Sequence, residues 1–359
     1  MPDLGIAQQR LYNQLITRQN ERSFDTPEAV VQWLGAVQAQ DYGAAKWAVG
    51  LRLPGATDDD IEQAMADGAI LRTHILRPTW HFVSPAAIRW MLALTAPRVN
   101  ALNAYYYRQA GLDDAIFARS NAALAEALRG GKQLTRQELR SALNHAGIET
   151  GDLLRFGYII MRAELDGIIC SGARRGKQFT YALLDERAPQ AETIDREEAL
   201  ARLTSRYFMS HGPATLQDFV WWSSLTAADA RAGLAMVGSQ FIHEEIDGQT
   251  YWLPPSTPSV KDPSPTVYLL PNFDEYIVSY TDRSAIFDES QVHKPGGRGD
   301  ILSNRTILID GQIAGTWKAT LKKDAAIVAP TFFTPLNAAE QSAFAAAEER
   351  YRAFLYPQK

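Results

Sequence analysis

Two glutamines two residues apart, Gln38 and Gln40, are the residues of this chain whose types and spacing best suit chemistry. They lie in the segment Val-Gln-Ala-Gln-Asp-Tyr at 37–42, just before Gly43. We expect this segment to be the last turn of the first long helix, where positions i and i+2 point about 200° apart and cannot share a site. The two amides converge only if the helix loosens there, or if one acts while the other packs. On residue types alone, a solvated polar helix end is the favoured interpretation.

Most standard catalytic and cofactor motifs are absent from the sequence. The chain has no Gly-rich phosphate loop, no His-Glu-x-x-His and no Gly-x-Ser-x-Gly. Its six histidines are scattered without the spacing of metal ligands. The single cysteine, Cys170, lies in an expected strand and reads as a small core residue, so no intrachain disulfide forms. We therefore expect no metal and no cofactor.

A second group of candidate residues lies in an expected hairpin, with strands at 71–75 and 79–83. His74 and His81 bracket this hairpin, and Arg77, Thr79 and Trp80 inside it could line a groove. Ordinary packing explains Trp80 equally well. If the groove holds DNA, Arg77, Trp80 and His81 are the residues that would contact it.

These residues belong to the first of three stretches that repeat one plan of short helices followed by a β-hairpin. The clearest copy is 135–184, where Thr135 and Glu138 form a capping box and a second helix at 152–166 has Leu153 on its apolar side. Strands at 168–170 and 179–183 then flank a basic tip. Helix, helix and hairpin outline a winged helix-turn-helix, a module used mostly on DNA. Helical hairpins with incidental β-ribbons are the alternative.

The other two copies are looser, and the C-terminal part differs from all three. One copy has helices starting at Thr26-Pro27 and near 59–66; the other has helices at 196–210, 215–222 and 226–237 and an Asp247-Gly248 turn between strands at 241–245 and 249–253. A Pro-rich linker at 254–265 precedes strands expected at 267–270, 276–280, 305–309, 312–318 and 325–329 and a closing helix at 338–355. The fold class is thus α+β: three tandem winged-helix units (1–110, 111–190, 191–255) and a β-rich, small barrel-like domain (256–359).

Composition and charge narrow the class of protein. Hydrophobic residues are 46% and charged residues 21% of 359, enough for ordinary cores, and no apolar run reaches the length of a membrane span. The start Met-Pro-Asp predicts no secretory signal, so we expect a cytoplasmic protein associated with the nucleoid. Net charge is −5, which is unusual for a DNA-binding protein, but residues 72–187 hold 16 Lys or Arg against 10 Asp or Glu. Such a local surplus, unless it arises by chance, steers a polyanion.

The hairpin tip of the second unit is the sharpest feature of that basic stretch. Arg174, Arg175 and Lys177 are flanked by Gly172 and Gly176 there, and we expect them to contact phosphates without reading sequence. A second Gly-rich basic segment, 287–302, contains Lys294 and Arg298. It is too long for a tight turn and is expected to be a mobile loop. Its cations either contact DNA or have no role.

The glutamine segment resembles the paired-glutamine signature of AlkZ-type winged-helix DNA glycosylases. Further matches to this family are Arg-Thr-His at 72–74, Arg-Pro-Thr-Trp-His at 77–81, Tyr-Phe-Met-Ser-His-Gly-Pro-Ala-Thr at 207–215, Asp-Phe-Val-Trp-Trp-Ser at 218–223 and Leu-Leu-Pro-Asn-Phe-Asp-Glu-Tyr at 269–276. Each match is short, but their order is specific and they span nearly the whole chain. A related branch carries aspartate in place of the second glutamine, so Gln40 places this chain with the crosslink-type branch.

The resemblance implies a fold of tandem winged helices curved around DNA, a C-terminal β domain with a hairpin near the active site, and excision of alkylated purines. Alkylation at N7 makes a purine cationic and weakens its bond to the sugar, so departure leaves an oxocarbenium-like centre. Such a leaving group needs little acid help. Gln40 would then align the attacking water, Gln38 would support it or contact the sugar, and Asp41 could stabilise the developing cation. Lys294 and Arg298 would hold the damaged nucleotide near Gln40.

The resemblance also sets expectations about partners. We expect a monomer that acts on double-stranded DNA with alkylated purines or crosslinks, without a membrane. A crosslinked base cannot swing fully out of the duplex, so an open site would replace a tight flipping pocket. Two other functions stay open: a winged-helix transcription regulator, which would bind one DNA sequence as a symmetric dimer, and a lesion-binding protein without activity. Release of a base from N7-methylguanine DNA separates an enzyme from both.

Overall fold

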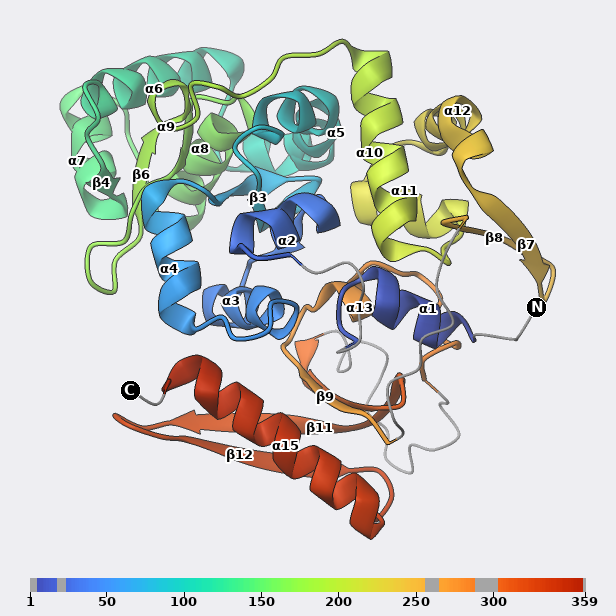
Figure 1. The fold of residues 1–359 in the computed structure, drawn as a ribbon. Helices are drawn as coiled ribbons and strands as arrows, with labels where there is room; N and C mark the ends of the chain where they lie inside the picture. The colour runs from blue at the N-terminus through green and yellow to red at the C-terminus, as the bar shows by residue number, and fades with distance from the viewer. Residues whose placement is uncertain (1–4, 18–23, 256–264, 288–302, 358–359) are drawn as a thin grey trace.

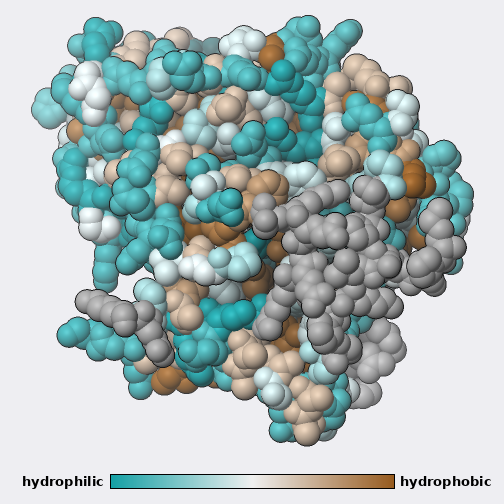
Figure 2. Space-filling view, in the orientation of Figure 1, coloured by the Kyte–Doolittle hydropathy of each residue, from teal (hydrophilic) through white to brown (hydrophobic). Residues whose placement is uncertain are grey.

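The computed structural model describes residues 5–17, 24–255, 265–287 and 303–357. Helices and small antiparallel sheets alternate along the chain, and the C-terminal strands and last helix lie together at one end (Figure 1). Hydrophilic side chains cover most of the face over α6 and α7 (Figure 2). Among the described helices, none combines the length and apolar character that a membrane span needs.

The first unit corrects the expected position of the paired glutamines. Thr26 caps α2 (Pro27–Leu34), with proline in the first turn, and Gly35 ends the helix at φ +83°. Gln38 therefore lies in an extended strand, β1 (Val37–Gln38), and Gln40 lies in the turn before α3; neither is in the last turn of a helix. The remaining elements of this unit are α1 (Ile6–Asn13), α3 (Tyr42–Leu51), α4 (Asp58–Asp67), β2 (Leu71–Ile75), β3 (Arg77–Val83) and the long α5 (Ile88–Gln109).

The second unit follows its expected pattern with one exception. Thr135 and Glu138 form the capping box of α7, and the hairpin closes in the three-stranded order β4-β6-β5. Leu153 was expected on the apolar side, but it is 73% exposed, because it is the first residue of α8 and precedes the part of that helix that packs on the core. The elements are α6 (Asp114–Leu128), β4 (Leu134–Thr135), α7 (Arg136–His145), α8 (Leu153–Leu165), β5 (Ile169–Ser171), β6 (Thr180–Leu183) and α9 (Leu184–Arg187).

The third unit is also a set of helices followed by a hairpin. Asp247 and Gly248 both have positive φ (51° and 75°), as the expected type I′ turn requires. The elements are α10 (Arg196–His211), α11 (Leu216–Ser223), α12 (Ala227–Val237), the 3-10 turn η1 (Gly238–Gln240), β7 (Ile242–Ile246) and β8 (Gln249–Leu253). The three helix-and-hairpin units are thus present; their assignment as winged helices stays a prediction.

The C-terminal part is an open sheet and not a barrel. Its strands β9 (Val267–Leu270), β10 (Arg305–Ile309), β11 (Gln312–Leu321) and β12 (Ala326–Phe332) pair antiparallel in the order β12-β11-β10-β9, and α15 (Ala338–Leu355) packs against it. The strand expected at 276–280 is wrong. That segment is largely a short helix, α13 (Glu275–Val278), capped by Asp274, because a short apolar run that is buried on all sides does not distinguish a strand from a helix.

Two apolar cores hold the molecule together. One joins α5–α8 to α10–α12, and the other joins α1–α4 to the C-terminal sheet and α15. Cys170 is buried in the first core, and burial raises the pKa of its thiol to about 12. Since the second core combines the two ends of the sequence, residues near position 40 pack against residues near position 270. The four-part division of the chain stays a prediction.

Candidate functional site

The sheet β1-β3-β2 positions the paired glutamines. Val37 and Ala39 are buried, while Gln38 is half-buried and Gln40 is exposed. Alternate residues of an extended chain point to opposite sides. Burial alternates in the same way along 37–40, which indicates that Gln38 and Gln40 both face away from the core.

Gln38 is held by one hydrogen bond at its side chain and one at its main chain. Arg77 Nη2 donates to Gln38 Oε1 (2.9 Å), and the Gln38 backbone N–H donates to Glu275 Oε1 (2.7 Å). Since a guanidinium has only donors, the carbonyl oxygen of the Gln38 amide must face Arg77. The Gln38 NH2 group has no partner among the described residues, so the side chain offers hydrogen-bond donors to a ligand.

Gln40 and Asp41 lie where β1 turns into α3. Gln40 Oε1 accepts a long hydrogen bond from Trp80 N (3.4 Å), which leaves capacity for a water. Asp41 caps α3, since its Oδ1 accepts from Ala44 N (3.1 Å), and its Oδ2 accepts from Asn272 Nδ2 (3.2 Å). Both oxygens of Asp41 thus already have a structural role beside Gln40.

His81 is a neutral neighbour of Gln38. The two residues are paired across β3 and β1, and His81 is fully buried. Burial and the positive charge of Arg77 lower the pKa of His81 to about 3. Its Nδ1 contacts Thr79 O (3.0 Å), which requires Nδ1–H to be the donor and leaves Nε2 as the acceptor facing Arg77 Nη2 (3.4 Å). His81 therefore supports Arg77 and is not a general base at neutral pH.

Trp80 lies on the other face of the same sheet, because it alternates with Arg77, Thr79 and His81 along β3. Its ring packs on His74 (centroids 4.3 Å apart) and under the Arg72 guanidinium (4.4 Å), and its Nε1–H donates to Glu164 Oε1 (3.3 Å). Glu164 also pairs with His74. The structure brings Arg77 and His81 to Gln38 but separates the Trp80 side chain from them.

The expected basic wing is partly engaged within the protein. Arg174 Nη1 pairs with Glu62 Oε2 (3.2 Å), and its guanidinium lies 5.1 Å from the Tyr42 ring centroid. Arg175 Nη1 pairs with Glu138 Oε1 (2.9 Å). Lys177 is exposed at the tip and has no ion pair among the described residues. A phosphate contact by the two arginines would have to compete with these carboxylates.

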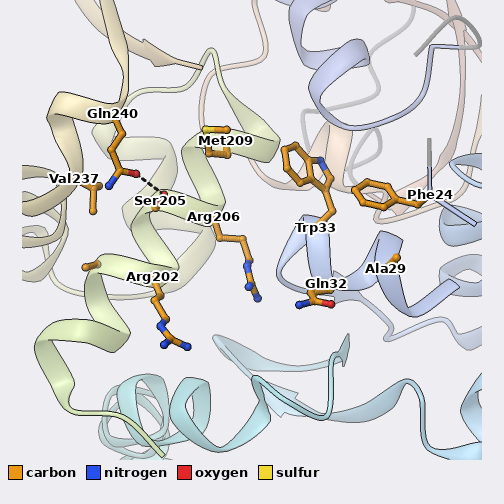
Figure 3. Close-up of a pocket in the computed structure, with 11 residues that line it drawn as sticks. Phe24, Ala29, Gln32, Trp33, Arg202, Ser205, Arg206, Met209, Val237 and Gln240 are labelled. Atoms are coloured by element: carbon orange, nitrogen blue, oxygen red, sulfur yellow. Dashed lines mark hydrogen bonds between the residues drawn. The ribbon is translucent and has the colours of Figure 1, made fainter. Parts of the chain in front are cut away.

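The other candidate features of the molecule are the basic loop, possible metal ligands and the cavities. Lys294 and Arg298 lie outside the described residues. No group of three or more His, Cys, Asp or Glu in the described part of the chain could hold a metal ion. Three cavities, of about 650, 750 and 330 Å³, are lined by residues other than Gln38 and Gln40. The first lies between α2 and α10, with Trp33 on one side and Arg206 on the other (Figure 3).

Sequence reasoning missed the contribution of α13 and the turn before it. Glu275 is fully buried and binds Gln38, Asn272 binds Asp41, and Asp274 pairs with a buried arginine, Arg52 (2.7 Å). The signal was present, since the segment at 269–276 was one of those that carried the family resemblance. Its pairing with a segment more than 200 residues earlier could not be inferred from it.

Comparisons with known proteins show the family of this chain and the proteins that it resembles. The family model described as "DNA glycosylase AlkZ-like" matches residues 31–354. The chain is similar to an interstrand DNA cross-link repair glycosylase of Streptomyces sahachiroi, with 24% identity over 304 residues that cover 80% of this chain and 81% of the relative. It also resembles the solved structure of the Streptomyces sahachiroi DNA glycosylase AlkZ, with a TM-score of 0.77, 21% identity and coverage of 99% and 98% of the two chains.

Proposed function

Because the chain belongs to the AlkZ-like DNA glycosylase family, we propose that it hydrolyses the N-glycosidic bond of N7-alkylated purines in double-stranded DNA. The observation that carries this proposal is that Gln38 and Gln40 are the two less buried residues of the segment 37–40, with Gln38 clamped by Arg77. Two neutral amides in fixed positions suit a reaction whose leaving group is already activated.

The reaction needs a positioned water more than a strong base. The alkylated purine carries a positive charge and leaves as a neutral base, so positive charge develops on the sugar and little acid catalysis is required. Gln40 Oε1 accepts an O–H of the attacking water and orients its lone pair toward C1′. Gln38, with its oxygen held by Arg77, donates from its NH2 group to an oxygen of the nucleotide. Asp41 would stabilise the cation electrostatically beside these two residues.

The enzyme is monofunctional in this proposal. A lyase step needs an amine that can attack the sugar, and the lysine near the motif is Lys46. Its Nζ is paired with Asp58 (2.6 Å) and Glu62 (2.9 Å), and the residue is 5% exposed. An amine nitrogen that is buried and bonded to two carboxylates is not placed to attack the sugar. The product is therefore an abasic site in an intact strand.

The exposure of Gln40 supports action on bulky lesions. Gln40 is exposed and lines none of the three cavities, so the reacting sugar can be approached without full extrusion of the base. This suits a crosslinked purine that stays tethered to the opposite strand. By similarity to the cross-link repair relative, we extend the proposal to interstrand crosslinks.

The test is single-turnover release of N7-methylguanine from duplex DNA. Gln40→Ala should slow excision at least ~100-fold, as for the loss of a positioning group, while duplex affinity hardly changes. Gln341→Ala, an exposed glutamine on α15, is the matched control and should behave as wild type. Equal rates for wild type and Gln40→Ala would refute the site. Tight binding to the modified duplex without release would indicate a lesion-binding protein, and binding to one unmodified sequence would indicate a regulator.

A further inference from the structure

A buried carboxylate lies directly behind the glutamine pair. Glu275, on α13, is fully buried and comes from a segment 237 residues after Gln38. Its Oε1 accepts from Gln38 N (2.7 Å), and its Oε2 accepts from Ser279 Oγ (2.6 Å) and Trp222 Nε1 (3.1 Å). Three donors that converge on one carboxyl group favour its ionised form.

The charge of Glu275 has a partner at the site itself. Arg77 and Glu275 both bind Gln38, one at the side chain and the other at the main chain. Burial by itself raises the pKa of Glu275, but the His211 ring beside Oε2, the nearby Arg77 charge and the Ser279 hydroxyl together lower it to about 2. Glu275 is therefore ionised throughout the neutral range, and the Arg77 guanidinium is a cation close enough to interact with its charge.

This inference rests on the proposed function of the glutamine pair. We propose that Glu275 is a positioning residue: its carboxylate anchors the Gln38 main chain and supplies the counter-charge that keeps Arg77 against Gln38 Oε1, so that Gln38 meets the nucleotide as a hydrogen-bond donor.

Two substitutions of Glu275 distinguish the effect of its charge from the effect of its distance to Gln38. Glu275→Gln keeps the size but removes the charge, and Glu275→Asp keeps the charge but withdraws it from Gln38 N. We expect Glu275→Gln to slow single-turnover excision about 10- to 100-fold, with duplex Kd changed less than about threefold. Glu275→Asp should have a smaller effect on the rate.

Asp218 offers a matched control for burial and hydrogen bonding. It is 1% exposed and accepts from Thr215 N (2.9 Å), Thr281 N (2.8 Å) and Thr281 Oγ1 (2.8 Å), without contacting either glutamine. Asp218→Asn should lower the melting temperature but leave the excision rate of the folded protein near wild type. Equal rate losses in Glu275→Gln and Asp218→Asn would overturn the positioning role.

A double variant of Glu275 and Gln38 tests the positioning role more directly than the single variants do. If Glu275 acts through Gln38, adding Glu275→Gln to Gln38→Ala should change the excision rate by less than about threefold. Rate losses that multiply in the double variant would show that Glu275 acts independently of Gln38, and the proposal would be wrong.

A readout independent of excision distinguishes this inference from the proposed function. Hydrogen exchange of the Gln38 backbone amide, followed by NMR on the full chain, should be slow in wild type and at least about tenfold faster in Glu275→Gln, with no change in Asp218→Asn. The Gln38 side-chain NH2 resonances, assigned by their loss in Gln38→Ala, should shift in Glu275→Gln alone. Unchanged exchange and unchanged resonances would overturn the inference even if wild type excises the base. If Glu275→Gln changes both the amide exchange and the side-chain resonances of Gln38 but wild type excises no base, Glu275 still positions Gln38 and the proposed reaction is refuted.

Discussion

Replacing Arg77 with methionine tests whether the clamp on Gln38 controls the reaction. Methionine keeps most of the aliphatic volume but removes the guanidinium that donates to Gln38 Oε1 (2.9 Å). Gln38 is then free to rotate its amide, and it loses the fixed donor orientation that the proposed mechanism uses. The sequence expectation for Arg77 was different, since it placed this residue in direct contact with DNA.

The expected size of the effect follows from the bond that is lost. A hydrogen bond to a charged group contributes about 1.5–3 kcal/mol. If that amount is lost in the transition state, the rate of excision falls about 10- to 100-fold. Glu275 keeps its three hydrogen bonds but loses the nearby cation, so we also expect a lower free energy of unfolding, by about 1–3 kcal/mol.

The assay is single-turnover release of N7-methylguanine, with duplex Kd measured over a range of salt concentrations. Arg187→Met is the control, because Arg187 is another partly buried arginine that donates to backbone oxygens, at Met65 and Ala66, away from the glutamines. Arg77→Met should lower the excision rate with little change in duplex Kd, whereas Arg187→Met should leave both the rate and Kd near wild type. A wild-type rate in Arg77→Met, with a salt slope reduced by about one, would show a phosphate contact and refute the clamp.

Three further outcomes are expected. Lys177→Ala should reduce the slope of log affinity against log salt by about one, whereas Arg174→Ala should change it less, because Arg174 is paired with Glu62; equal changes would contradict this. The free energy of unfolding should fall as pH drops below about 6.5, since the unfolded chain then protonates at His81 while the folded chain does not, and fall further below about 4.5 through Glu275; a melting temperature independent of pH would contradict both shifts. Excision should proceed in excess EDTA, and inhibition that a divalent metal reverses would refute the water-and-glutamine mechanism.

Local signals predicted the elements that depend on local chemistry. Thr135 and Glu138 form the expected capping box, Asn337 caps α15 just before the helix expected at 338–355, and Asp247 and Gly248 form the expected turn between β7 and β8 with positive φ. In each case the deciding interaction links residues only a few positions apart. The sequence pattern contains both partners, so it suffices.

Errors arose where a distant partner decides the local structure. The turn at Gly35 sends the chain along β3, so Gln38 pairs with His81 and becomes extended although its own neighbours allow a helix. The apolar run after Asp274 is buried by elements from both ends of the chain, and burial alone does not set its period. The expected barrel is instead an open sheet. The sequence could not show this, since closure depends on whether the edge strands pair and not on the number of strands.

The sequence by itself determined which residues carry the candidate chemistry: a pair of neutral glutamines, with no metal motif and no phosphate loop to suggest another reaction. Only the tertiary structure decided how that pair is oriented. Glu275 and Arg77 reach Gln38 from segments 237 and 39 residues away, and only folding brings these two hydrogen bonds to one residue. The identity of the candidate residues thus follows from a local sequence pattern, and their geometry is set by long-range burial.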